Sequence, residues 1–196
     1  MNIKIRLIYL TLILFSSANI VSAQNPDIEL LRSIHVSRNQ NLDPAFKFIS
    51  KTATPISLGL PLTYLFLGGV NNNKAQLNLA LKTGITITAA MAISTVLKYA
   101  IDRPRPYEKY PDIHALSSDF TPSFPSGHTT SAFCTATTIS LLYPKWYVIV
   151  PSYTWASMVA YSRLHMGMHY PLDILGGIII GMGTSYLSYR IMKRYK

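Results

Sequence analysis

Three short polar segments interrupt an otherwise apolar chain, and each combines side chains that can bind or transfer a phosphoryl group. In chain order they are Lys98-x6-Arg105-Pro106, Pro125-Ser126-Gly127-His128 and Ser162-Arg163-x5-His169-x3-Asp173. Lysine and arginine bind phosphate oxygens, and a histidine can act as a nucleophile or as a general acid and base. The three segments therefore predict a histidine-based phosphate-transfer site.

The first segment supplies two cations. Lys98 and Arg105 are seven residues apart, so they share a helix face if the helix persists that far. Pro104 and Pro106 make this end irregular, and Arg105 is expected in the turn that leaves the helix. A cation that ends an apolar helix can also simply extend toward the membrane surface, and we assign that role to Arg103.

The second segment opens an apolar stretch. Ser126 is a good N-cap residue, and Gly127 would let a ligand approach the backbone closely. Free N–H groups at a helix N-terminus bind phosphate, which would place His128 beside the anion. A plain capped helix is the alternative interpretation of these residues.

The third segment pairs a histidine with a carboxylate. Asp173 follows His169 by four residues, with Pro171 near a helix start. The carboxylate can fix the tautomer of the imidazole, which leaves the other ring nitrogen free to attack an electrophile. Arg163 adds a planar, bidentate donor for phosphate oxygens.

A metal site is the competing interpretation of the same segment. His165, His169 and Asp173 have a spacing of four and four, which could hold a divalent ion. Pro171 would break the single helix that this requires, and the nearby cations would repel the ion. We therefore predict no metal site, with His165 at the entrance of the phosphate site and His114 in a loop.

The rest of the chain must position these segments. Of its 196 residues 49% are hydrophobic and 13% are charged, about half the usual charged share. Five stretches lack charged residues, namely 53–70, 83–97, 129–144, 146–162 and 174–189. Shorter helices are expected at 28–34 and 46–49. We predict an all-α bundle of about five to six mostly transmembrane helices, with the site at one membrane face; five buried helices of a soluble bundle are the alternative.

The first residues have the pattern of an export signal. Lys4 and Arg6 precede an apolar core at 7–15, and small residues end at Ala23. We expect residues 1–23 to be a cleaved signal peptide and 24–196 to be a single helical domain. An uncleaved first span is the alternative.

The formal net charge is +10, and the basic residues are distributed as the expected topology requires. With an exported N-terminus, the basic loop 71–76, Lys145 and the tail 190–196 fall on the inner side, as the positive-inside rule favours. The three polar segments then share the exported face. A basic balance can also indicate an anionic lipid, an anionic substrate or nucleic acid, and of these partners we expect no nucleic acid.

The motif set resembles that of the type 2 phosphatidic acid phosphatase superfamily, which includes class A acid phosphatases and vanadium haloperoxidases. All three motifs occur in order and without departure over residues 98–173, and the context at 123–129 resembles the membrane-bound lipid phosphatases. The resemblance implies that His169 forms a phosphohistidine, that Asp173 orients it, and that His128 protonates the leaving oxygen and then activates water. It implies that the phosphoryl oxygens are held, without a metal or other cofactor, by Lys98, Arg105, Ser126, Gly127 and Arg163.

The expected function is that of a membrane-bound lipid phosphatase in a bacterial-type inner membrane, with its site on the periplasmic face. Candidate substrates are undecaprenyl pyrophosphate, phosphatidylglycerol phosphate, phosphatidic acid and a lipid A phosphate. The alternatives are a soluble periplasmic acid phosphatase, a vanadate-dependent haloperoxidase and a non-enzymatic lipid-binding or lipid-flipping protein. The family's membrane members have six helices, so either the leader or residues 27–50 would have to supply one; the oligomeric state stays open.

Overall fold

All regular structure in the described part of the chain is helical. The computed structural model describes residues 25–194, so the expected signal peptide lies outside it. The helices are α2 (Pro26–His35), η1 (Gln40–Leu42), α3 (Asp43–Lys51), α4 (Ala53–Val70), α5 (Lys74–Ile101), α6 (Pro106–Lys109), α7 (Gly127–Leu142), α8 (Trp146–His165) and α9 (Pro171–Arg194). The prediction of an all-α bundle is confirmed, and each of the five apolar stretches forms most of one long helix.

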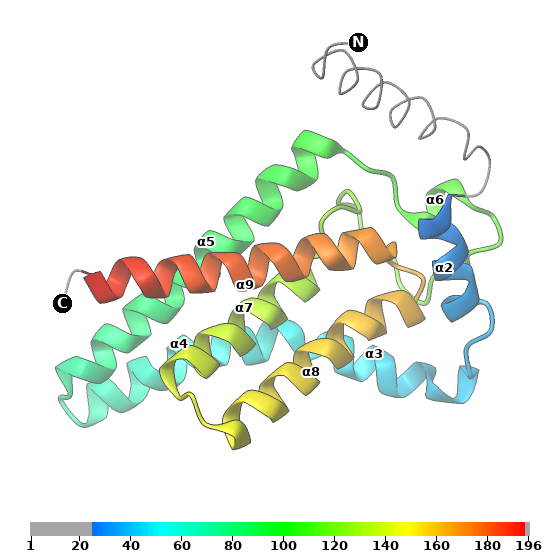
Figure 1. Cartoon of the computed structure of the whole chain (residues 1–196). Coiled ribbons are helices and arrows are strands. Elements are labelled where there is room, and N and C mark those ends of the chain that lie inside the picture. The colour runs from blue at the N-terminus through cyan, green and yellow to red at the C-terminus, as the bar shows by residue number, and fades with distance from the viewer. Residues whose placement is uncertain (1–24, 195–196) are drawn as a thin grey trace, which may run out of the picture.

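Helix α7 is the centre of the bundle. It packs against α4, α5, α8 and α9, which surround it (Figure 1). Every residue from Thr129 to Thr138 is buried. Small side chains dominate this helix, so its neighbours approach it closely on all sides.

The outer helices turn apolar side chains outward. Phe66 of α4, Val96 of α5 and Ile179 of α9 are 70%, 68% and 62% exposed. Two helical segments, 40–70 and 74–109, are long and apolar enough to cross a membrane, with only 17% and 22% of their most apolar windows buried. So much exposed apolar surface suits a lipid environment.

Residues 27–50 form no span of their own. They fold into α2, η1 and α3, and α3 leads into α4 through Thr52. Of the two sources proposed for a sixth span, this segment therefore supplies only short helices, and the leader lies outside the described residues.

Helices α7 and α9 touch at backbone distance because α9 carries glycine where they cross. A Cβ on Gly177 would lie 2.8 Å from the Ser126 carbonyl oxygen, and one on Gly181 would lie 2.5 Å from that of Thr130. This contact lets the Ser126 N–H donate to the Asp173 carbonyl oxygen at 3.0 Å. The second and third polar segments are thereby brought together.

A methyl group at this crossing should destabilise the bundle. Gly181→Ala places a Cβ against backbone atoms that cannot turn aside, so we expect a loss of about 1–3 kcal/mol. The measurement is the thermal unfolding midpoint in detergent. Gly183→Ala is the matched control, because a Cβ there meets nothing within 4 Å. Equal midpoints for the two variants would contradict the close-contact interpretation.

Candidate active site

The three polar segments converge at one end of the bundle. They lie at the C-terminal end of α5, the N-terminus of α7, and the turn from α8 to α9. The end of α8 and the start of α9 lie beside α2 (Figure 1). This arrangement agrees with the prediction that the three segments share one face.

His169 faces its carboxylate through one ring nitrogen. Its Nδ1 lies 3.4 Å from Asp173 Oδ2 and 3.5 Å from Ser123 Oγ. These contacts are long, as is common in catalytic groups without substrate. The arrangement favours a tautomer with the proton on Nδ1, which leaves the Nε2 lone pair available for attack.

The Asp173 carboxylate is fully buried and held on both oxygens. Oδ2 accepts from Ser123 Oγ at 2.5 Å and from the Tyr170 N–H at 2.9 Å. Oδ1 accepts from Arg103 Nη1 at 2.7 Å. A buried carboxylate with this many donors stays ionised and fixed in place.

The assignment of Arg103 to membrane snorkelling is wrong. Its guanidinium also binds Asp27 Oδ2 at 2.6 Å and stacks 3.8 Å from the centre of the Tyr170 ring. Burial disfavours its charge, but hydrogen bonds to the carboxylates of Asp27 and Asp173 compensate for the lost hydration. Sequence spacing could not show this role, because its partners lie 76 and 70 residues away.

Arg105 and Lys98 both donate to backbone carbonyl oxygens of the loop before α7. Arg105 is 1% exposed; it donates to the Thr121 carbonyl oxygen at 2.8 Å and pairs with Asp119 at 2.8 Å. Lys98 Nζ donates to the Pro122 carbonyl oxygen at 2.5 Å. A phosphate bound between these cations would share or replace these acceptors.

Of the three expected phosphate-binding cations, Arg163 is the one with a guanidinium nitrogen still available to a new acceptor. It is 4% exposed, and its Nη1 donates to Ser50 Oγ at 2.7 Å. Its Nε is buried without a hydrogen-bond partner among the described residues. A buried guanidinium nitrogen with no acceptor is costly, and a phosphate oxygen would satisfy it.

The N-terminus of α7 adds backbone donors. Ser126 caps it, with its Oγ accepting from the Thr129 N–H and from Thr129 Oγ1. A Cβ on Gly127 would meet only Met91 Cε, at an ordinary 3.7 Å. The protein itself therefore does not require glycine here, and the approach of a ligand explains it better.

A polar cavity of about 340 Å³ opens beside these groups. His128 and Arg163 line it together with Ser117, Ser118 and Asp119 of the loop before α7. Lys47 and Lys51 of α3 also line it, although the sequence analysis did not select them. Their signal in the sequence was weak, because lysines on a short amphipathic helix are common.

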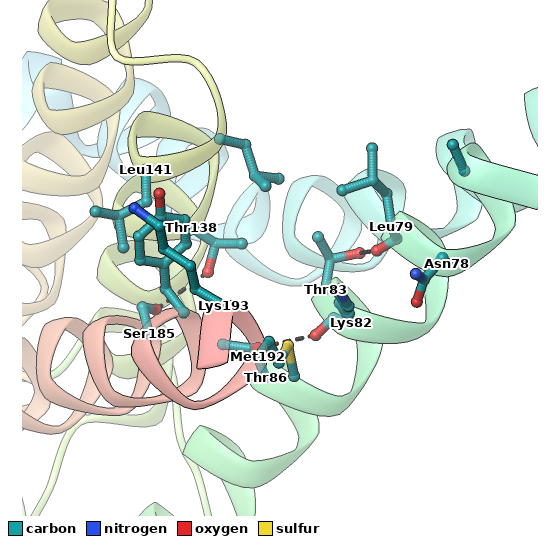
Figure 2. A pocket seen from close by; sticks show the side chains of 13 residues that line it. Asn78, Leu79, Lys82, Thr83, Thr86, Thr138, Leu141, Ser185, Met192 and Lys193 are labelled. Atoms are coloured by element: carbon teal, nitrogen blue, oxygen red, sulfur yellow. Dashed lines mark hydrogen bonds between the residues drawn. The ribbon is translucent and has the colours of Figure 1, made fainter. Parts of the chain in front are cut away.

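A second cavity, of about 400 Å³, lies elsewhere in the bundle. Figure 2 shows it between α5, α7 and α9, with Lys82, Thr86 and Lys193 among its walls. Its lining contains no residue of the three polar segments. Of these two cavities, the smaller, polar one is the one that candidate site residues line, namely His128 and Arg163.

His165 does not stand at the site entrance, contrary to the prediction. It is 2% exposed, its Nε2 binds Asp43 Oδ1 at 2.8 Å, and its ring packs on Phe46. His165 and His169 thus face different carboxylates, and among residues 25–194 no group of three His, Cys, Asp or Glu side chains is placed to hold a metal. His114 lies in a loop, as expected, and its carbonyl oxygen contacts His35.

Comparison with known proteins gives concordant matches. The family model described as the PAP2 superfamily matches residues 79–196. An undecaprenyl-diphosphatase of Sulfolobus acidocaldarius is 30% identical, over 84% of this chain and 78% of its own. An undecaprenyl-diphosphatase of Bacillus subtilis is 29% identical, over 83% of this chain and 82% of its own. The crystal structure of a transmembrane PAP2 type phosphatidylglycerolphosphate phosphatase from Bacillus subtilis has a TM-score of 0.74 at 22% identity, covering 98% of this chain and 96% of the other.

Substitution of Arg103 should slow the chemistry more than it weakens binding. Arg103→Gln frees Asp173 to move, and we expect kcat for phosphate release to fall by up to about 100-fold with a smaller change in KM. Arg32→Gln is the control, because Arg32 forms its ion pairs in an exposed position. A rise in KM at unchanged kcat would show that Arg103 binds substrate instead.

The protonation state of the His169 imidazole should affect how the stability of the protein depends on pH. Burial lowers the pKa of its imidazole to about 3, helped by Arg163 and Arg105 and opposed by the hydrogen bond to Asp173. An imidazole in an unfolded chain has a pKa of about 6.5, so stability is retained above that pH and falls as the pH drops from there. We expect the thermal midpoint to fall more steeply on acidification in the wild type than in His169→Asn. Parallel curves would refute a neutral, buried His169.

Proposed function

The chain belongs to the PAP2 superfamily and is a membrane lipid phosphatase, and we propose that it removes the terminal phosphate of an undecaprenyl-type lipid diphosphate through a phosphohistidine at His169. The observation that carries the chemistry is the His169–Asp173 pair together with Arg163, whose Nε has no hydrogen-bond partner within residues 25–194. The names of two relatives, which align over 84% and 83% of the chain, support the substrate.

In the first step His169 Nε2 attacks the terminal phosphorus. An N–P bond forms, the bond from phosphorus to the bridging oxygen breaks, and the lipid monophosphate leaves. His128 donates a proton to the departing oxygen where one is needed. Asp173 stabilises the positive charge that develops on His169, because its carboxylate lies 3.4 Å from Nδ1.

In the second step water hydrolyses the phosphohistidine. His128 takes a proton from the water, the new O–P bond forms, and the N–P bond breaks to release orthophosphate and restore His169. The negative charge on the phosphoryl oxygens is met throughout by Lys98, Arg105 and Arg163, and by the N–H groups at Gly127 and the start of α7. Each bond made or broken is thus assigned to a group of this chain, its substrate or water.

We place the site on the periplasmic face of the inner membrane. Its support is the charge distribution: the opposite end of the bundle carries Lys74, Lys145 and the basic end of α9, where positive-inside topology expects them. The exposed apolar faces of α4 and α5 disfavour the soluble acid phosphatase alternative.

The test is phosphate release from a lipid panel by the protein purified in detergent with EDTA. The panel contains undecaprenyl diphosphate, phosphatidylglycerol phosphate, phosphatidic acid and a lipid A phosphate. We expect the highest kcat/KM on the diphosphate, and no turnover by His169→Ala on any lipid. Radiolabelled terminal phosphate should be trapped on the wild type in acid-labile form.

Two results would overturn this proposal. An active His169→Ala variant would exclude His169 as the nucleophile. Loss of activity in EDTA would favour the metal-site alternative. His128→Ala tests the protonation of the leaving group, because the leaving oxygen of a monoester is more basic than that of a diphosphate. This variant should therefore lose more activity on phosphatidic acid than on the diphosphate.

A further inference from the structure

Helix α3 presents one polar face to the active-site cavity. Lys47, Ser50 and Lys51 all line the cavity, together with His128 and Arg163. Their spacing of three and four residues places them on one side of the helix. None of them belongs to the three motif segments, so the cavity has a second wall of positive charge.

This wall is fixed in place relative to the catalytic groups. Ser50 Oγ accepts from Arg163 Nη1 at 2.7 Å in the middle of α3. Asp43 at its start binds His165 at 2.8 Å, and Thr52 just after its end accepts from Trp155 Nε1 at 2.9 Å. Three polar contacts to α8 thus hold the lysines at a set distance from Arg163.

The two lysines carry uncompensated charge. Neither forms an ion pair with a carboxylate within residues 25–194. The one acid that lines the cavity, Asp119, is already paired with Arg105 at 2.8 Å. Lys47 is half-buried, which strengthens its attraction for an anion compared with that of a lysine in open water.

The cations at this end of the bundle differ in burial. The inner set is buried: Arg163 lines the cavity, Arg105 pairs with Asp119 of the cavity wall, and Lys98 binds the same loop at Pro122. The outer set is Lys47 and Lys51 on α3, of which Lys51 is exposed. A phosphoryl group that His169 attacks must lie at the inner set. A substrate with one phosphate would leave the outer set without a partner, but a diphosphate would reach both.

We propose that Lys47 and Lys51 bind the second phosphate of a lipid diphosphate, the one joined to the lipid. The inference rests on the proposed function and names the residues that set its preference for diphosphates over monophosphates. The lysines hold the negative charge that accumulates on the departing lipid monophosphate, so they act on the diphosphate reaction alone.

The experiment compares two substrates that share one lipid tail, farnesyl diphosphate and farnesyl monophosphate, in neutral detergent. Wild type and Lys47→Ala/Lys51→Ala are assayed on both. We expect the double variant to lower kcat/KM on the diphosphate roughly 10- to 100-fold, as the loss of charge-assisted hydrogen bonds implies, with little change on the monophosphate. Lys47→Arg/Lys51→Arg should retain most of the preference.

Lys109→Ala is the matched control, because Lys109 is exposed near the same end of the bundle and does not line the cavity. An equal loss on both substrates, or no loss on either, would overturn the inference. So would a loss confined to vesicles with anionic lipid, because the lysines would then bind the membrane surface. A wild type inactive on the diphosphate overturns the proposed function as well, whereas an active wild type with an unchanged ratio in the variant overturns this inference alone.

Discussion

The buried carboxylate of Asp173 is the constraint on which the rest of the site depends. An ionised carboxylate inside a protein is costly unless donors surround it. Arg103 donates to Oδ1, Ser123 Oγ and the Tyr170 N–H donate to Oδ2, and His169 Nδ1 lies against Oδ2. Because these groups come from separate parts of the chain, a fold that satisfies the carboxylate also positions His169, the proposed nucleophile.

The bundle meets this constraint through the close contact of α7 and α9. The absence of side chains at Gly177 and Gly181 allows backbone contact where the helices cross. That contact brings the N-terminus of α7 to the start of α9, where the Ser126 N–H binds the Asp173 carbonyl oxygen. One packing interaction therefore positions both the helix end proposed to bind phosphate and the proposed nucleophile.

The cations of the site divide into two groups with different surroundings. Arg105 and Arg163 are buried and held by oxygen atoms of the loop before α7 and of α3. Lys47 and Lys51 stand at the cavity wall without carboxylate partners in the described residues. The first group suits the charge that develops at phosphorus, and the second suits charge further along the substrate.

Residue types and their spacing within one or two helical turns were enough to predict the long helices and most of the candidate site. Uncharged stretches gave the long helices, and motif spacing selected the residues that the structure brings to one end of the bundle. Arg103 and His165 were misassigned because their partners, Asp27, Asp173 and Asp43, are remote in sequence. Lys47 and Lys51 went unnoticed because lysines on a short amphipathic helix are common, and the packing of α3 against α8 is what brings them to the cavity. Helical periodicity depends on neighbours within one turn or two, whereas the pairing of buried charges depends on which helices pack together, and only the tertiary structure decides that.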